Sequence, residues 1–352
     1  MSRLKFEGAW TALVTPFTEE REIDWEGFRK NIEFQISQGI TGILPVGTTG
    51  ESPTLLWKEH VQVISSCLEA AREKCGVMAG TGSNSTKEAL QATEEAKEAG
   101  ADSVLLMDCY YNGPSSLELR KEYYGQVAQA YPDVYVVPYI IPGRTGTAMS
   151  PEDLAILSME CPNVRAVKEA TGDFERMARI RELVGDDFDI LSGDDDISFK
   201  MMIDPRIKSS GVISVISNVA PAAVEEMARK VLAGEQAEAR EIQKALEPLF
   251  EIVTVKCKDS RTLPRKRKAA VEDRFRNPLP IKTLMNGLGM AAGLCRQPLG
   301  KMTCAGVKMV RDAAKSVWEN NPGILEPVEE AYEVDIGERL ANDAYWNALA
   351  YK

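Results

Sequence analysis

The segment GVMAGTGSNSTKEALQATEEAKEAGADSVLLMD, residues 76 to 108, decides the fold. It opens with the short apolar run GVMAG, continues through the helix-like stretch TKEALQATEEAKEA and closes with a second apolar run, SVLLMD. A strand, a crossover helix and a neighbouring parallel strand need about this length. The segment therefore predicts one unit of a parallel sheet in which a helix connects two strands.

The same unit recurs through the first part of the chain. Each of the first seven apolar runs is followed by a helix-like stretch, and several runs lack period-2 alternation, as expected for strands covered on both faces. Eight consecutive units indicate an α/β fold of the (β/α)8 TIM-barrel type, with a doubly wound open sheet as the alternative from pattern alone. The runs span residues 9–17, 42–47, 76–80, 103–108, 134–140, 164–170, 188–193 and 211–217.

The remainder of the chain has a different pattern, which predicts only helices after residue 220. We expect a barrel over residues 1 to 225, a C-terminal helical region over 226 to 322 and an acidic C-terminal tail over 323 to 352. A basic insertion at 256 to 276 holds nine basic and three acidic residues, whereas the tail holds seven acidic and two basic residues. These opposite charges suggest the hypothesis that the tail docks on or near the insertion, within a subunit or across an interface. The alternative is two independently solvated segments.

Composition narrows the class of protein. Hydrophobic residues make up 44% and charged residues 27% of the 352 residues, so a sizeable core can form. The formal net charge of −11 argues against a general polyanion binder. No run approaches the ~18 apolar residues of a membrane span, and the first ten residues lack an apolar signal core. We therefore expect a cytoplasmic protein.

Several kinds of cofactor site are disfavoured. Seven cysteines without a CxxC pair resemble reduced thiols rather than a zinc cluster, and His60 is the only histidine. His60 falls in an amphipathic stretch that predicts a histidine on a helix surface. GLGMAAG, at 287 to 293, has the wrong spacing and context for a dinucleotide loop, and the aspartates at 194 to 196 suit a helix N-terminus better than a calcium loop.

Candidate catalytic groups lie at strand ends, because active sites of such barrels are built there. Lys168 stands near the end of the apolar run VRAVKEA. Burial would lower its pKa and leave more nucleophilic amine, which imine formation with a carbonyl substrate requires. The alternative is a lysine that extends to the rim of the barrel or pairs with Glu169.

Two further strand ends offer substrate contacts. GTTGES, at 47 to 52, has glycines that let a carboxylate approach the backbone, with Thr48 and Thr49 as donors, although a plain turn that caps a helix would use the same residues. In PYIIPGRTG, Tyr139 can relay a proton and Arg144 can hold a carboxylate. Core packing and a surface charge are the respective alternatives.

Together the motifs form a recognisable set over about residues 6 to 300: GTTGES, GTGSNST, YYN, PGRTG, VKEATGD, LSGDD, GVISVISNVAP and NPLPIK, in that order. The set resembles the dihydrodipicolinate synthase and N-acetylneuraminate lyase superfamily of class I aldolases. The resemblance implies a barrel with a helical appendage, in a homotetramer or homodimer, and no metal or organic cofactor. It is greatest to the branch that condenses pyruvate with L-aspartate 4-semialdehyde in lysine and diaminopimelate biosynthesis.

The resemblance implies four catalytic residues. Lys168 would form the imine with pyruvate. Thr48, Tyr139 and Tyr111 would relay protons, with Tyr111 reaching the active site of a neighbouring subunit.

It also implies four substrate-binding residues. Thr49 would bind the pyruvate carboxylate, and Arg144 would attract the carboxylate of the aldehyde. Gly193 and Ile213 would line the pocket through their backbone.

An effector site is implied as well, because L-lysine inhibits many members of this superfamily. The corresponding positions here are Ser52, His60, Asn84, Glu88 and Tyr110. A carboxylate such as that of Glu88 suits the ammonium groups of the ligand.

The chain departs from the pattern of the superfamily at several places. Ile140 stands where the synthases usually have asparagine, Pro53 and Trp57 occupy positions beside the effector site, and the insertion and tail are longer than usual. A lyase for 2-keto-3-deoxy sugar acids remains an enzymatic alternative. A non-catalytic nucleic-acid-binding or regulatory barrel that uses PRKRK, at 264 to 268, is the alternative from another class.

Overall fold

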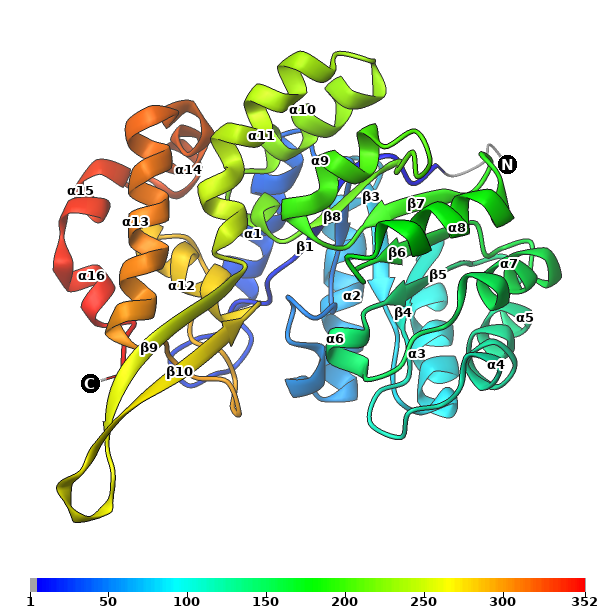
Figure 1. The fold of residues 1–352 in the computed structure, drawn as a ribbon, viewed down its shortest axis with the longest axis horizontal. Coiled ribbons are helices and arrows are strands. Elements are labelled where there is room, and N and C mark those ends of the chain that lie inside the picture. Colours follow the sequence, from blue (N-terminus) through cyan, green and yellow to red (C-terminus); the bar gives the residue numbers. More distant parts are fainter. Residues whose placement is uncertain (1–4, 352) are drawn as a thin grey trace.

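The structure is a computed structural model and describes residues 5 to 351. Eight parallel strands close into a barrel in which each strand pairs with the next and β8 pairs with β1 (Figure 1). The expected (β/α)8 barrel is confirmed, and the open sheet is excluded. The strands are β1 (Gly8–Ala12), β2 (Gly42–Leu44), β3 (Gly76–Gly80), β4 (Ser103–Met107), β5 (Tyr135–Ile140), β6 (Ala166–Glu169), β7 (Asp189–Ser192) and β8 (Gly211–Ser214).

The strands bury both of their faces. In β5, Val137 and Tyr139 join the cluster inside the barrel, whereas Val136 and Ile140 belong to the larger cluster between the strands and the helices. Successive side chains of a strand point to opposite faces, so each strand needs apolar residues at consecutive positions. This double burial explains why the apolar runs lack alternation.

Helices cover the outside of the barrel. Several begin with a capping side chain: Asp24 accepts a hydrogen bond from the Gly27 amide, and Ser150 accepts one from the Asp153 amide. The outer elements are α1 (Trp25–Ser37), η1 (Ser52–Thr54), α2 (Trp57–Ala71), α3 (Thr86–Glu98), α4 (Ser116–Glu118), the π-helical η2 (Leu119–Tyr124), α5 (Gly125–Ala130), α6 (Pro142–Thr145), α7 (Pro151–Glu160), α8 (Phe174–Val184), α9 (Asp195–Ile203), η3 (Ile216–Asn218) and α10 (Pro221–Leu232).

A second group of helices packs beside the barrel and is drawn from yellow-green (α11) to red (α16) in Figure 1. α11 contacts both α10 and α13, so the group is joined to the barrel through packed helices. Its elements are α11 (Gln236–Glu251), α12 (Leu279–Leu288), α13 (Cys304–Asn320), η5 (Pro322–Ile324), α14 (Glu326–Tyr332), α15 (Ile336–Ala341) and α16 (Asp343–Asn347).

The prediction that only helices follow residue 220 is wrong. β9 (Thr254–Thr262) and β10 (Lys268–Arg276) form an antiparallel hairpin with the turn η4 (Pro264–Lys266) between them, and the hairpin projects from the body of the molecule (Figure 1). Charged residues occupy so many of its positions that the alternation of apolar residues is obscured. The basic insertion is therefore a structured arm, which we call the basic hairpin.

The tail packs on the helices. Trp346 is buried against Gly287 of α12, and the Tyr332 hydroxyl donates a hydrogen bond to Asn31 of α1 at 2.6 Å. The tail carboxylate of Asp343 pairs with Arg311 of α13 at 2.5 Å. Its ion-pair partner is thus a helix residue rather than one of the basic hairpin.

Over residues 5 to 351, no helix is both long and apolar enough to cross a membrane. The same residues contain no group of three or more His, Cys, Asp or Glu side chains placed to hold a metal ion.

Candidate active site

A cavity of about 240 Å³ opens at the carboxyl ends of the barrel strands. Polar side chains from several strand ends line it together with residues of the basic hairpin. The polar lining residues are Thr48, Thr49, Tyr139, Arg144, Lys168, Asp194, Thr254, Arg274, Arg276 and Asn277.

Lys168 points into this cavity from the end of β6 and is only 5% exposed. Burial lowers its pKa to about 8, with a smaller contribution from Arg144, against the opposing charges of Asp194 and Asp195. Glu169 points the other way, where it is fully buried with its Oε1 3.4 Å from Arg176 Nε. The alternation of the strand thus separates Lys168 from Glu169. The lysine is buried instead of extending to the rim, and the carboxylate beside it in the sequence pairs with Arg176.

Tyr139 stands beside Lys168 because β5 and β6 pair in that register. The Lys168 Nζ lies 4.2 Å from the centre of the Tyr139 ring. Burial raises the pKa of the phenol, and a side-chain hydrogen bond with Thr48 lowers it in part. The amine, the phenol and the Thr48 hydroxyl therefore form one connected group.

The GTTGES loop is held by a buried ion pair. Glu51 has a left-handed backbone, with φ of 58°, and its Oε1 accepts a hydrogen bond from Lys282 Nζ at 2.7 Å. The other carboxylate oxygen accepts from the Arg296 amide at 2.8 Å. Because both charges are almost fully buried, this pair fixes the loop that carries Thr48 and Thr49 to α12.

Asn277 connects two of the expected binding residues. Its side-chain amide donates to Thr49 Oγ1 at 3.0 Å, and its backbone carbonyl accepts from Arg144 Nη2 at 2.8 Å. Sequence reasoning missed this residue, although it begins the motif NPLPIK. Its role depends on contacts with residues 228 and 133 positions away in the chain, which no local pattern reveals.

Gly193 lines the cavity, and a Cβ at this position would lie 3.2 Å from Lys168 Cε and 2.7 Å from the Ala170 side chain. The close approach explains the glycine. Ile213 lies in the closed cluster inside the barrel, and Val215, two residues further on, lines the cavity.

The three aspartates after β7 do not share one role. Asp194 lines the cavity without capping α9, and burial raises its pKa to about 6, with Asp196 raising it further and Lys168 and Arg144 lowering it. Asp195 turns toward β8, where its carboxylate accepts from the Val215 amide at 2.9 Å. The prediction that these aspartates only stabilise the N-terminus of a helix is therefore incomplete, because Asp194 contributes a negative charge to the cavity.

Tyr111 does not line the cavity of its own chain. Its side chain is 92% exposed, and its backbone φ of 77° is unusual for a residue with a side chain. The loop after β4 therefore presents this phenol outward.

The residues expected to form the effector site fall into two groups, His60 with Ser52 and Glu88 with Asn84 and Tyr110. His60 is buried rather than on a helix surface, because the start of α2 folds over η1, and its Nε2 donates to the Ser52 carbonyl at 2.9 Å. Asn84 and Tyr110 line a separate cavity of about 300 Å³. The Glu88 carboxylate accepts a hydrogen bond from Ser83 Oγ at 2.5 Å. Burial raises the pKa of the Tyr110 phenol, and the negative charge of Glu88 raises it further.

The comparisons with known proteins agree with this geometry. Residues 5 to 317 match the model of the Dihydrodipicolinate synthetase family. The chain is 40% identical, over 88% of its length and 97% of the relative, to the 4-hydroxy-tetrahydrodipicolinate synthase of Nitratidesulfovibrio vulgaris. It also resembles two solved dihydrodipicolinate synthases, each with a TM-score of 0.79. The one from Cyanidioschyzon merolae with lysine bound is 33% identical over 89% of this chain and 98% of that one. The one from Acinetobacter baumannii complexed with pyruvate is 31% identical over 91% of this chain and 100% of that one.

Proposed function

The chain belongs to the dihydrodipicolinate synthetase family, and we propose that it condenses pyruvate with L-aspartate 4-semialdehyde as a 4-hydroxy-tetrahydrodipicolinate synthase. The observation that carries the proposal is the buried amine of Lys168, with a pKa lowered to about 8, beside the Tyr139 phenol in a cavity at the strand ends. A neutral lysine amine is the nucleophile of class I aldolases.

In the first half of the reaction, Lys168 Nζ attacks the keto carbon of pyruvate, and water leaves to give an imine. The protonated imine withdraws electrons, so the methyl carbon of pyruvate loses a proton and becomes the nucleophilic end of an enamine. The Thr48 hydroxyl and the Tyr139 phenol receive and return these protons through their hydrogen bond. Thr49 binds the pyruvate carboxylate.

In the second half, the enamine carbon attacks the aldehyde and forms a carbon–carbon bond. The resulting alkoxide takes a proton from the Tyr139 relay. The amino group of the acceptor then attacks the imine carbon, which closes the ring and releases Lys168 as the free amine. The ammonium group of the acceptor gives up one proton to solvent before this attack, and one water molecule leaves for each heterocycle formed, so atoms and charges balance.

Arg144 binds the carboxylate of the aldehyde at the mouth of the cavity. Ile140, which replaces the usual asparagine, belongs to the cluster between strands and helices, whereas Ile141 lines the cavity. The substitution therefore bears less directly on the acceptor than its place in the sequence suggests. The substitution is therefore no argument for a 2-keto-3-deoxy sugar acid lyase over the synthase.

We further propose a homotetramer or homodimer in which Tyr111 completes the proton relay of a neighbouring subunit. The exposed phenol and the left-handed backbone of Tyr111 support this arrangement, because the side chain is held away from its own cavity.

Borohydride trapping tests the proposed function. Purified protein incubated with pyruvate and borohydride should gain the mass of a reduced pyruvyl adduct at Lys168, as peptide mapping would show. The trapped intermediate should disappear when L-aspartate 4-semialdehyde is added before the reductant. Protein that gains no adduct, or gains it at another lysine, would overturn the mechanism.

A further inference from the structure

The basic hairpin has two different faces at its base. Residues paired across an antiparallel hairpin lie on the same face, so Arg274 shares a face with Lys256, and Arg276 shares it with Thr254. Arg274, Arg276 and Thr254 all line the active-site cavity. One face of the hairpin base is therefore a wall of the active site.

The opposite face anchors the hairpin to the helical region. Val255 and Cys257 are buried, and the Cys257 sulfur lies 3.3 Å from the hydroxyl of Thr303, which caps α13. Phe275 packs near Gly306 of the same helix. Because this face is fixed on α13, the arginines of the other face are directed toward the cavity rather than placed there by a flexible arm.

The cavity mouth carries an excess of positive charge. Three guanidinium groups, of Arg144, Arg274 and Arg276, line it together with the carboxylate of Asp194. Among residues 5 to 351, neither Arg274 nor Arg276 is paired with a carboxylate, whereas Arg261 further out on the hairpin pairs with Asp273 at 2.5 Å. The positive charges of the two arginines at the cavity are thus not neutralised by a carboxylate and can attract an anion.

The three guanidinium groups influence one another. Desolvation lowers the pKa of Arg144, and the charges of Arg276 and Arg274 lower it further, against Tyr139 and Asp194. Arg276 Nη1 also donates to the Gly143 carbonyl at 2.9 Å, directly before Arg144 on α6. Like charges held this close favour the binding of an anion among them.

We propose that the basic hairpin extends the acceptor subsite, with Arg274 and Arg276 binding, beside Arg144, the anionic end of the aldehyde. This inference rests on the proposed function, because it assigns these residues to the second substrate of the same reaction. The class of acceptor is an aldehyde with a carboxylate or phosphate remote from the reacting carbon. An uncharged aldehyde of the same length is discriminated against.

The two arginines contribute in different ways. Arg274 has only its charge and its hydrogen-bond donors to offer an anion, since its side chain is exposed and forms no hydrogen bond within the described chain. Arg276 additionally positions Arg144 through the Gly143 carbonyl. Replacing Arg276 should therefore change kcat as well as KM, whereas replacing Arg274 should act mainly on KM.

Steady-state kinetics of hairpin variants test the inference. Arg274→Ala combined with Arg276→Ala should raise KM for L-aspartate 4-semialdehyde about tenfold or more and weaken the ionic-strength dependence of kcat/KM. KM for pyruvate and borohydride trapping at Lys168 should not change.

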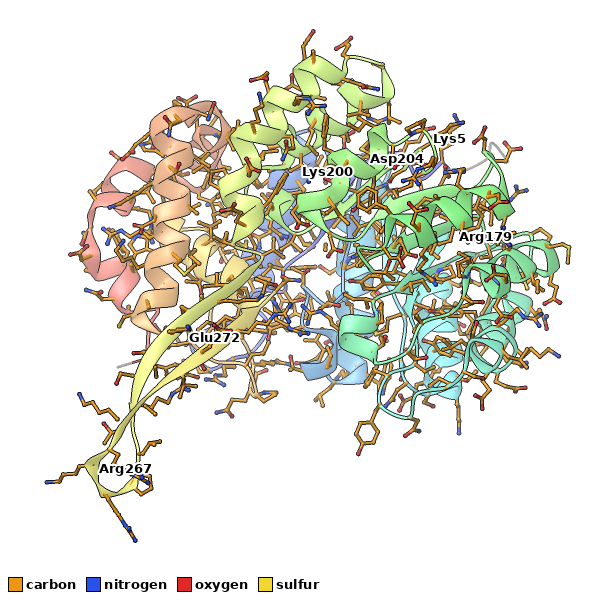
Figure 2. All side chains as sticks on the ribbon, viewed as in Figure 1. Lys5, Arg179, Lys200, Asp204, Arg267 and Glu272 are labelled. Atoms are coloured by element: carbon orange, nitrogen blue, oxygen red, sulfur yellow. The ribbon has the colours of Figure 1, made fainter. Side chains whose placement is uncertain are left out.

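Arg265→Ala combined with Arg267→Ala is the matched control, because it also removes two positive charges from the same hairpin, at its turn and away from the cavity. Figure 2 shows the neighbouring Arg267 at this far end, well separated from the body of the molecule. The control should keep the acceptor KM within about twofold. Equal effects of the control and the double variant, or an unchanged acceptor KM in a folded double variant, would overturn the inference.

Arg276→Lys guards against a variant that simply unfolds. It keeps the charge but loses the planar fork that reaches the Gly143 carbonyl. We expect it to retain the ionic-strength dependence while kcat falls. Loss of that dependence in this variant, at an unchanged melting temperature, would contradict binding through charge.

A comparison of acceptors separates this inference from the proposed function. Succinic semialdehyde has a carboxylate but no amine, so it tests only the step that forms the carbon–carbon bond. The wild-type protein should prefer it to butanal in this step, and the double variant should lose the preference. If glyceraldehyde 3-phosphate is the best acceptor, the synthase activity is wrong but the role of the hairpin stands. If the double variant keeps the preference for charged acceptors, the role of the hairpin is wrong whichever acceptor is best.

Discussion

The side-chain amide of Asn277 donates a hydrogen bond to the hydroxyl of Thr49, although the two residues are 228 positions apart in the chain. Asn277 follows directly on the basic hairpin, and Thr49 lies in the loop after β2. The contact therefore joins an appended segment to the part of the barrel expected to bind the pyruvate carboxylate. At the same time the Asn277 carbonyl holds Arg144 at the acceptor end of the cavity.

Asn277→Ala should separate these two functions. The side-chain bond to Thr49 is lost, while the carbonyl that holds Arg144 remains, so KM for pyruvate should rise about two- to tenfold with little change in the acceptor KM. Initial rates with each substrate varied in turn measure this. Thr49→Val and the double variant complete a mutant cycle, and fully additive effects would show that the two side chains act independently.

The pH dependence of imine formation follows from the pKa of Lys168, which burial lowers to about 8. Only the neutral amine attacks pyruvate, so the second-order rate constant for imine formation should rise with pH and level off above about pH 8. An ordinary lysine would continue to gain reactivity up to about pH 10.4. Stopped-flow measurements at low pyruvate concentration distinguish the two profiles, and Lys168→Ala should remove most of the turnover.

Tyr139→Phe should lower kcat by about 10²–10⁴-fold if the phenol transfers protons. KM for pyruvate should change much less, because the hydroxyl acts mainly in the transition state. Thr48→Val should have a similar effect, since the two hydroxyls share a hydrogen bond. A phenylalanine variant with normal kcat would reduce Tyr139 to a packing residue.

The Glu51–Lys282 pair should matter for stability rather than for chemistry. Replacing one partner, as in Lys282→Met, leaves a buried charge without its counterion. The free energy of unfolding, measured by urea denaturation, should fall by about 3–5 kcal/mol. Combining it with Glu51→Gln should recover part of the loss. A double variant that is less stable than Lys282→Met would contradict this account.

L-Lysine should inhibit the enzyme if Ser52, His60, Asn84, Glu88 and Tyr110 form an effector site, as we propose. Glu88→Gln removes a negative charge from beside Tyr110, so it should raise the concentration of lysine needed for half-inhibition. Glu94→Gln, on the exposed face of the same helix α3, is the matched control. Full activity of the wild-type protein at millimolar lysine would show that the site does not function.

Sequence reasoning was most successful where the physical signal was local. The spacing of eight apolar runs predicted the barrel because each strand and its helix form a unit of fixed length. A lysine in the apolar run at 164 to 170 predicted the buried amine, because solvation makes lysine rare in such a place. Both inferences needed only residues near each other in the chain.

It was least successful where contacts join distant segments. Nothing near Glu51 indicates that Lys282 is its partner, and the hairpin at 254 to 276 was missed because its apolar residues, such as Val255 and Phe275, are few among charged neighbours. The burial of His60 depends on how α2 packs on η1, where the imidazole donates to the Ser52 carbonyl. Each of these features is determined by tertiary packing, which a local pattern does not record.

A hydrogen bond joins the residues on either side of the basic hairpin, since the backbone N–H of Asn277 donates to the Val253 carbonyl at 3.0 Å. The segment between them is thus a separate unit, because a short turn from Val253 to Asn277 in its place would leave the barrel scaffold continuous. Grafting residues 254 to 276 between the equivalent positions of a relative without a hairpin would transfer Arg274 and Arg276 as a unit. If Arg274 and Arg276 bind the acceptor as we propose, the acceptor preference of this protein can be changed through the hairpin alone, without any change to the strand that holds Lys168.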